Sequence, residues 1–308
     1  MNAHVSLSAP IAFDAPFRFA HDLCGHPLLS LPALAELAAI LPGDRVEYNS
    51  GRLQPNQDPD ATPAIDLAPD EVVRRIETCG AWMVLRNVEQ VPAYRALLEE
   101  TLDGLARRFG QEGREAAGME EVEGFIFAAS AGSVTPFHAD YEENLFLHLA
   151  GPKIFHLFDN GDRSFVSEAD LETFPGKHRN LAYEDSFYSR GQHHQMHPGE
   201  GLYVPYAWPH WVETGDGHAI SIAVTWKTRA VRRHNALLFM NAVLRRIGLP
   251  QPAPGRRPLW DAAKIAAYRP LRLTVKPLIK AEALRRTLRA ALFGRKANYF
   301  YRRGGADA

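Results

Sequence analysis

Residues 124–158 read GFIFAASAGSVTPFHADYEENLFLHLAGPKIFHLF, and this stretch decides the fold. It consists of short runs rich in Phe, Ile, Leu and Val, separated by turn-forming pairs at 131–132 and 151–152. Two further runs of the same kind follow at 201–208 and 218–226. Many short strands separated by turn residues are typical of a β-sandwich or barrel, whereas a parallel sheet alternates its strands with helices. We therefore expect a mainly β core.

Helical patterns flank this core. Residues 31–41 and 92–109 place apolar side chains at helical spacing, and Pro69 followed by two acidic residues opens another helix. Residues 232–247 and 279–293 have the pattern of amphipathic basic helices. The sequence thus predicts three parts. They are a helical and mixed N-terminal flank over 1–110, a β core over 111–228, and a basic helical C-terminal extension over 229–308.

Composition narrows the class of protein. The chain has 308 residues with 46% hydrophobic content, which suits one large domain with an appendage. Its two cysteines form no C-x-x-C pair, which argues against a disulfide scaffold or a zinc finger. No stretch approaches the ~18 apolar residues of a membrane span, and residues 1–13 lack the pattern of a secretory signal. We expect a cytoplasmic protein that is not transmembrane.

Charge is unevenly distributed. Residues 229–308 contain 19 Lys or Arg but 3 Asp or Glu, whereas residues 1–228 contain 16 basic and 33 acidic residues. Such a basic extension is typical of a surface for nucleic acid or for an anionic membrane. It can equally dock on the acidic body of its own or a neighbouring subunit. Charge alone does not decide between these readings.

The segment TPFHAD at 135–140 carries the first chemical signal. His138 and Asp140 are two residues apart, so on a strand their side chains point the same way, about 7 Å apart along the backbone. His210 lies in a late strand segment, at its end, and offers a third ligand. Two histidines and one carboxylate on a face are the ligands of non-haem iron(II) oxygenases. The alternative for an isolated H-x-D is a strand histidine bonded to a neighbouring acid.

Lys153 strengthens the metal hypothesis. On the predicted strand it shares a face with Phe155 and Leu157, so it points inward. Burying an ammonium group without a partner is costly, and a small dicarboxylate between Lys153 and the metal would provide that partner. Thr135, three residues before His138, can add a hydroxyl to the same carboxylate.

These motifs together resemble the JmjC/cupin-like oxygenases that use 2-oxoglutarate. Members of the family show T-P-x-H-x-D, an Asn four residues after the Asp and a Lys thirteen after it, matched here by Asn144 and Lys153. Their distal histidine follows a P-G-[DE]-x-L-Y-[IV]-P segment, matched by residues 198–205. Within the family, the spacing is most similar to the group typified by the asparaginyl hydroxylase that acts on the hypoxia-inducible factor. The similarity covers residues 124–228.

The resemblance implies a double-stranded β-helix, the cupin or jelly-roll core, with iron(II) at one mouth. It implies His138, Asp140 and His210 as metal ligands. It further implies that 2-oxoglutarate chelates the iron, that its far carboxylate meets Lys153 and Thr135, and that O₂ is the second co-substrate. Oxidative decarboxylation then yields succinate and oxidised substrate. Asn144 would lie beside the metal.

Some residues depart from the family pattern or stay ambiguous. Thr225 stands where that group has an Asn near the co-substrate, and Phe125 or Phe127 occupies the region of a carboxylate-binding Tyr. The tract 192–197 (QHHQMH) favours a solvated turn over a metal site. His148 and His156 lie on strands without a matching acid, as packing residues do. Trp208, Trp211 and Trp226 are expected in the pocket walls or the core.

The substrate stays open. The resemblance favours hydroxylation of a protein or peptide side chain, and a small metabolite is the second candidate. A cupin without oxygenase activity, an isomerase or a ligand-binding module, is a third reading, which Lys153 argues against. The loop at 159–190 is long enough to cover the mouth. The helix at 232–247 is expected to form a homodimer through its apolar residues Leu237, Leu238, Val243, Leu244 and Ile247.

Overall fold

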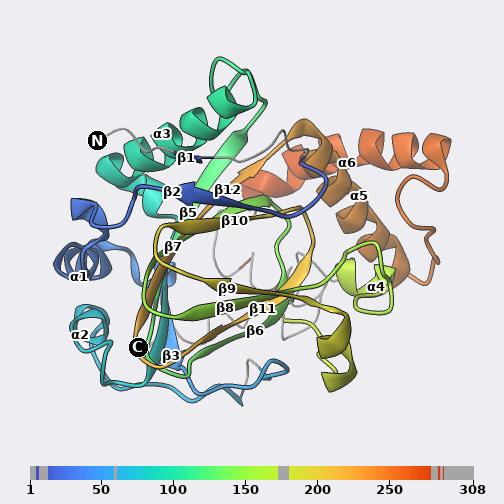
Figure 1. The fold of residues 1–308 in the computed structure, drawn as a ribbon. Helices are drawn as coiled ribbons and strands as arrows, with labels where there is room; N and C mark the ends of the chain where they lie inside the picture. The colour runs from blue at the N-terminus through green and yellow to red at the C-terminus, as the bar shows by residue number, and fades with distance from the viewer. Residues whose placement is uncertain are drawn as a thin grey trace.

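Two antiparallel sheets form the centre of the molecule, and helices lie against two sides of them (Figure 1). The computed structural model describes residues 5–6, 13–58, 61–172, 180–278, 284 and 287. The prediction of a mainly β jelly-roll core with helical additions is confirmed.

The larger sheet has eight strands, in the spatial order β1-β2-β10-β7-β12-β5-β4-β3. Their bounds in that order are Val5–Ser6, Phe17–His21, Glu200–Val204, Glu143–Ala150, Ala219–Lys227, Glu120–Ala129, Ala81–Arg86 and Val46–Ser50. The N-terminal flank thus supplies strands to both edges of this sheet.

The smaller sheet has four strands, in the order β6-β11-β8-β9. Their bounds are Val134–Ala139, Pro209–Thr214, Lys153–Leu157 and Gln192–Met196. From β5 to β12 the chain crosses repeatedly between the two sheets, and every pairing is antiparallel. This alternation is the connectivity of a jelly roll.

Two expectations about strands were wrong. Residues 192–196, expected as a turn, form β9, which pairs with β8 along its whole length. A strand at a sheet edge exposes one side to water, so β9 lacks the apolar alternation that marks inner strands. His210, expected at the end of a strand, is the second residue of β11.

The helices occupy two regions. Figure 1 shows α1, α2 and α3 beside the large sheet, and α5 with α6 at the opposite side of the molecule. The α-helices α1 to α6 span Leu31–Ile40, Pro69–Arg74, Pro92–Arg108, Glu168–Leu171, Arg229–Arg246 and Pro258–Leu278. Short 3₁₀ helices span Pro27–Leu29, Gly43–Arg45, Val88–Gln90 and Asp185–Arg190. The helix expected over 279–293 lies outside the described residues, apart from positions 284 and 287.

The two faces of the large sheet differ in chemistry. On β7, Leu145 and Leu147 pack into the main hydrophobic cluster, which includes buried residues of α1, α2 and α3. The alternate residues Asn144 and Phe146 line a cavity between the sheets instead. Successive side chains of a strand point to opposite faces, so β7 both supports the core and supplies part of the cavity wall.

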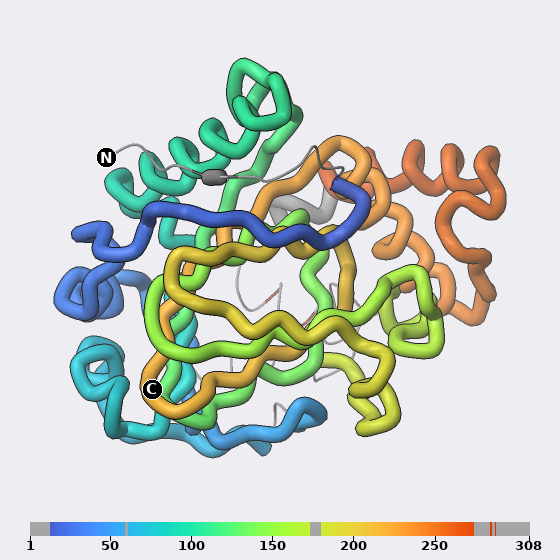
Figure 2. Tube along the Cα trace, viewed as in Figure 1, coloured from blue at the N-terminus to red at the C-terminus, as the bar shows by residue number. Residues whose placement is uncertain are grey.

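The described part of the C-terminal extension docks on the acidic body of its own chain. Arg232 forms ion pairs with Glu120 and Glu121 at the start of β5. Arg245 of α5 pairs with the buried Glu172, which follows α4, and Figure 2 shows these segments side by side. This favours docking within the chain for these residues. Binding of nucleic acid or a membrane surface stays a prediction.

Helix α5 uses part of its apolar surface inside the subunit. Leu237 and Leu238 are buried, whereas Ile247, just beyond the helix, is 68% exposed. Of the five residues expected at a dimer contact, these two are therefore committed to the subunit's own core. The homodimer itself stays a prediction. Among the described residues, no helix combines the length and the apolar character needed to cross a bilayer.

Candidate metal centre and its cavity

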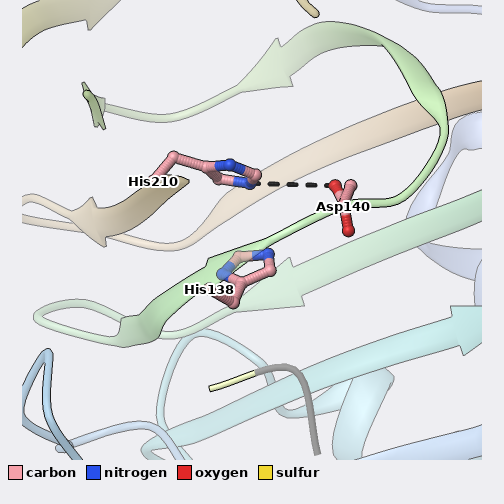
Figure 3. Close-up of side chains that lie close together, drawn as sticks. All are labelled: His138, Asp140 and His210. Carbon is pink, nitrogen blue, oxygen red and sulfur yellow. Dashed lines mark ion pairs between the residues drawn. The ribbon is translucent and has the colours of Figure 1, made fainter. Parts of the chain in front are cut away.

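Three side chains, of which His210 is far from the other two in the sequence, converge at one end of the small sheet. His138 on β6 lies directly opposite His210 on β11 in the strand register, and Asp140 follows two residues after His138. One ligand atom from each of the three lies within 4.8 Å of the others, and Figure 3 shows the side chains clustered together. His210 Nε2 is 3.8 Å from an oxygen of Asp140. This spacing suits three ligands of one ion.

Hydrogen bonds fix the orientation of both imidazoles. His138 Nδ1 lies 2.7 Å from the carbonyl oxygen of Pro136, and His210 Nδ1 lies 2.9 Å from that of Trp208. A carbonyl oxygen only accepts, so each Nδ1 carries the proton and each Nε2 presents its lone pair. Metal-binding histidines are typically held in this way through their second nitrogen. The donor set of two imidazole nitrogens and one carboxylate therefore fits iron(II).

Asp140 is held from two sides. Asn144 donates a hydrogen bond to its carboxylate at 3.0 Å, while the buried amide oxygen of Asn144 has no hydrogen-bond partner among the described residues. The backbone N–H of Ala207 donates to the carbonyl oxygen of Asp140 at 2.8 Å. Ala207 has φ of 59°, which is costly for a residue with a Cβ. This turn ties the segment before β11 to the segment after β6, and so ties the ligands together.

A cavity runs from these three residues between the two sheets. It has a volume of about 170 Å³, roughly ten times the ~10–15 Å³ that one ordered water requires. Its wall includes Phe146 of β7, Phe155 of β8 and Lys153. Phe155 also stacks on the His210 ring, with centroids 4.8 Å apart. The cavity therefore joins the candidate metal ligands to a buried lysine.

Lys153 points inward, as predicted. It is 4% exposed, and its ammonium group donates to the hydroxyl of Ser221 at 2.8 Å. The group also lies 5.6 Å from the centroid of the Phe146 ring. Burial lowers the pKa of Lys153 to about 7, because no carboxylate in the described residues compensates its charge. A buried cation of this kind favours an anionic ligand.

The remaining predicted residues also line the cavity. Thr135 accepts a hydrogen bond from the indole N–H of Trp82 at 2.8 Å, which leaves its own hydroxyl proton available. Phe125 and Phe127 of β5 and Thr225 of β12 lie in the same wall. The Thr225 hydroxyl contacts the carbonyl oxygen of Glu123 at 3.5 Å. The structure thus brings all seven predicted site residues to one cavity.

Two strand histidines have polar partners that the sequence did not reveal. His156 was expected to lack a matching acid, and this was wrong: its Nε2 lies 3.2 Å from Glu213, and its Nδ1 lies 2.8 Å from Nδ1 of His193. His148 contacts the hydroxyl of Ser221 at 3.1 Å. Both histidines are buried, so the description as packing residues holds in part.

Sequence reasoning also missed part of the cavity wall. Glu47 and Asn49 of β3, with Trp82 and Arg86 of β4, come from the N-terminal flank. Glu47 and Arg86 form an ion pair at 3.3 Å. Asn180, within the long loop, lines the cavity and forms an isolated bridge with His138. Nothing in the local sequence marks these residues, because the sheet pairing brings them to the cavity.

The comparison with protein families agrees with this architecture. Residues 86–230 match the family model described as a cupin-like domain. This stretch is similar to the cupin-like domain family. The match includes β5 to β12, and hence both strands that carry the candidate metal ligands, and Lys153. Trp208, Trp211 and Trp226 are not among the described residues that line the cavity, and they pack in or against the hydrophobic clusters of the core.

Solved structures resemble the cupin-like domain and its flanks only distantly. An X-ray structure of Escherichia coli YcfD is 16% identical over 90% of this chain and 70% of that chain, with a TM-score of 0.48. A structure of the Escherichia coli ribosomal oxygenase YcfD is 14% identical over 90% of this chain and 69% of that chain, with a TM-score of 0.44. The DMSP lyase DddQ from Ruegeria pomeroyi DSS-3 is 17% identical over 34% of this chain and 38% of that chain, with a TM-score of 0.23.

No curated protein matches the chain. The particular resemblance to the asparaginyl hydroxylase group finds no support in these comparisons. Likenesses at this distance concern the fold, so they transfer no activity or substrate to this chain. The chemistry has to be inferred from the site itself.

Proposed function

We propose that this protein is an iron(II)- and 2-oxoglutarate-dependent oxygenase that hydroxylates a side chain of a protein or peptide. One observation carries the proposal. A cavity has a two-histidine, one-carboxylate cluster in its wall, and the same wall contains a buried ammonium group. A dicarboxylate that also carries a keto group matches both features, since it can bind a metal and a cation at once.

His138, Asp140 and His210 would hold the iron, and three protein ligands leave positions open for co-substrates. When bound, the iron supplies the redox chemistry that couples decarboxylation of 2-oxoglutarate to oxidation of the substrate. Lys153 would bind the far carboxylate of 2-oxoglutarate, and the Thr135 hydroxyl would donate to the same group. Phe146 and Phe155 exclude water around this end of the cavity.

The substrate class rests on the part of the cavity wall that comes from β3 and β4. Glu47, Arg86 and Asn49 place donors and acceptors there, and none of them is assigned to iron or 2-oxoglutarate. Groups of this kind bind amides and charged side chains of a peptide. Asn180 adds another amide beside His138. A small polar metabolite is the alternative, and the substrate experiment below distinguishes the two.

Anaerobic loading with iron(II) and 2-oxoglutarate tests the first part. We expect a weak metal-to-ligand charge-transfer band in the visible, and succinate formation once O₂ is admitted. Lys153→Met should keep iron binding but require far more 2-oxoglutarate, because the buried cation is removed without changing the metal ligands. Asp140→Ala should lose the band and the turnover.

A protein that binds iron but shows no band with 2-oxoglutarate would contradict the proposal and favour a cupin without oxygenase activity. For the substrate, peptide libraries and a metabolite set are incubated with the loaded enzyme, and products are scored for addition of one oxygen atom. Hydroxylation in the peptide set supports the proposed class. Turnover confined to the metabolite set would contradict it.

A further inference from the structure

Lys153 is the inner end of a chain of hydrogen bonds that connects three elements. Its ammonium group lies 2.8 Å from the hydroxyl oxygen of Ser221 on β12, which lies 3.1 Å from Nδ1 of His148 on β7. Nε2 of His148 lies 2.6 Å from the carbonyl oxygen of Gly151. Ser221 and His148 are fully buried. Neither was assigned a role in the cavity from the sequence.

The carbonyl oxygen of Gly151 sets the direction of every bond in this chain. A carbonyl only accepts, so Nε2 of His148 must carry the proton. In a neutral imidazole Nδ1 is then an acceptor, so the Ser221 hydroxyl donates to it. The lone pairs of Ser221 are thereby turned toward Lys153. In the described part of the chain, Ser221 is the one hydrogen-bond partner of the Lys153 ammonium, whose other N–H groups are free to meet a ligand.

The anchor of the chain is rigid. Gly151 has φ of 78°, and a Cβ at this position would lie 1.9 Å from the carbonyl oxygen of His218. Any residue other than glycine would therefore have to displace backbone. On the other side, His21 contacts the carbonyl oxygen of His148 at 3.0 Å. His148 is thus held through its ring by the Gly151 carbonyl and through its own backbone carbonyl by the His21 side chain.

We propose that Ser221 and His148 are positioning residues that hold the Lys153 ammonium for the far carboxylate of the dicarboxylate co-substrate. This inference rests on the proposed function, because it assumes that Lys153 meets a carboxylate. Neither residue need touch the co-substrate. They act through Lys153 by supplying the acceptor that its ammonium group requires in a buried site.

The charge state of His148 supports the assigned directions. Burial, together with the positive charge of Lys153, lowers the pKa of His148 to about 4. The imidazole is therefore neutral at physiological pH, and Nδ1 can accept. The charged groups that act on it are Lys153, His21 and Glu200, and among these Glu200 is the one that favours protonation. A protonated His148 would donate from both nitrogens and repel Lys153.

Variants at the two positions test the proposal. Ser221→Ala and His148→Phe should each weaken 2-oxoglutarate binding about ten- to hundredfold, the usual range for a hydrogen bond to a charged group. Iron(II) affinity should not change, and kcat at saturating 2-oxoglutarate should change little. His148→Asn places an oxygen where Nδ1 lies and should retain most of the affinity. Ser133→Ala is the control, because Ser133 is buried and bonds the carbonyl of Ala81 outside the cavity.

The pH dependence separates positioning from general damage. Without the Ser221 hydroxyl as an acceptor, the charged form of Lys153 is less stable, so the pKa of Lys153 should be lower. The pH above which 2-oxoglutarate binding weakens should therefore fall in Ser221→Ala but not in Ser133→Ala. If wild type binds 2-oxoglutarate and both variants bind it equally well, this inference is overturned while the proposed function stands. If wild type does not bind 2-oxoglutarate, the proposed function fails first.

Wild-type protein offers a test that requires no variant to fold. Nitrogen-15 NMR of labelled histidine reports the tautomer and charge of His148. We expect a neutral ring with the proton on Nε2 from pH 6 to pH 8, a window well above its pKa of about 4. A ring that carries the proton on Nδ1, or a charged ring in this range, overturns the assignment.

Discussion

Within the described residues, two groups of two histidines and one carboxylate can be compared, and the first has the geometry of a metal site whereas the second does not. The first is His138 on β6, Asp140 directly after β6 and His210 on β11, whose ligand atoms lie within 4.8 Å of one another. The second, which we call the outer cluster, is His156, His193 and Glu213 on β8, β9 and β11. The outer cluster is not among the residue groups that can hold an ion, although it lies wholly within the described residues.

The difference lies in the hydrogen bonds of the imidazole rings. In the first group each Nδ1 bonds a backbone carbonyl, so both Nε2 atoms face the carboxylate. In the outer cluster His193 bonds the carbonyl of Tyr188 through Nε2 and His156 through Nδ1. Glu213 meets His156 at its other nitrogen. The polar atoms of the outer cluster therefore form a chain of hydrogen bonds with one another, and their lone pairs do not converge on a position where an ion could bind.

Protonation reinforces this contrast. Burial and the neighbouring His193 lower the pKa of His156 to about 3, and burial raises the pKa of Glu213. Both shifts favour a neutral pair in which Glu213 donates its proton to Nε2 of His156. His156 also stacks on Trp211, with ring centroids 3.7 Å apart. We conclude that residue types alone identify a metal site poorly. The hydrogen bond of the second imidazole nitrogen decides whether the first nitrogen can bind an ion.

Removing one histidine from each group should give the largest difference in iron(II) affinity. His138→Ala should weaken iron(II) binding by more than about hundredfold, because it removes a metal ligand. Loss of a residue that only orients a ligand already weakens metal binding about 10- to 100-fold. His193→Ala should leave iron binding unchanged. Anaerobic titration with iron(II), or with cobalt(II) as a spectroscopic probe, measures both. Loss of metal binding in His193→Ala would show that the outer cluster contributes to the centre.

Asn144 tests whether orientation matters at the metal end. Asn144→Ala removes the donor to Asp140 at 3.0 Å and should weaken iron binding about 10- to 100-fold. The matched change at the outer cluster is Glu213→Gln, which should have no effect on iron. The same titration gives both affinities. Equal affinities in wild type and Asn144→Ala would mean that Asp140 needs no support from this amide.

The pH dependence of 2-oxoglutarate binding should come from Lys153 and not from the outer cluster. With a pKa of about 7, Lys153 in the free protein loses its proton as the pH rises through 7, whereas a bound carboxylate raises that pKa. Affinity is therefore full below pH 7 and falls about tenfold for each pH unit above it. Calorimetry in buffers of different ionisation enthalpy should detect proton uptake on binding.

Two results would contradict this account. One is an affinity that stays constant from pH 7 to pH 9, and the other is the same pH dependence in Lys153→Met. The outer cluster provides the control. His156→Phe should keep the wild-type pH dependence, because His156 has a pKa of about 3 and stays neutral over this range.

The sequence predicted the centre because local periodicity determines much of it. His138 and Asp140 share a face through the two-residue repeat of a strand, and Lys153 shares one with Phe155. His210 was proposed from its place at the end of a late strand segment, and the family spacing then matched it. The outer cluster could not be predicted, because it depends on the register of three strands. His156 lies opposite His193 on one side and Trp211 on the other, and a bulge follows His210. Register is a property of the assembled sheet.

The same limit explains why Ser221 was missed. It lies in the apolar strand β12, where a small polar residue attracts no attention unless the pairing with β7 is known. In that pairing Ser221 stands beside His148. Glu47, Asn49 and Arg86 were missed for a related reason. They lie in a flank assigned to packing, which in fact extends the cavity wall through β3 and β4.

The smallest expected effect on chemistry, with a clear effect on stability, comes from His156→Phe. The change keeps a ring against Trp211 but leaves Glu213 and His193 without their shared partner. Both partners reach water, because the Glu213 side chain is 38% exposed and His193 is exposed, so the free energy of unfolding should fall by the net value of a hydrogen bond, about 0.5–1.5 kcal/mol. Urea denaturation measures it. Iron affinity should match wild type, because His156 pairs with Trp211 in the strand register and is not one of the three candidate metal ligands. A large loss of iron together with unchanged stability would reverse the roles assigned to the two groups.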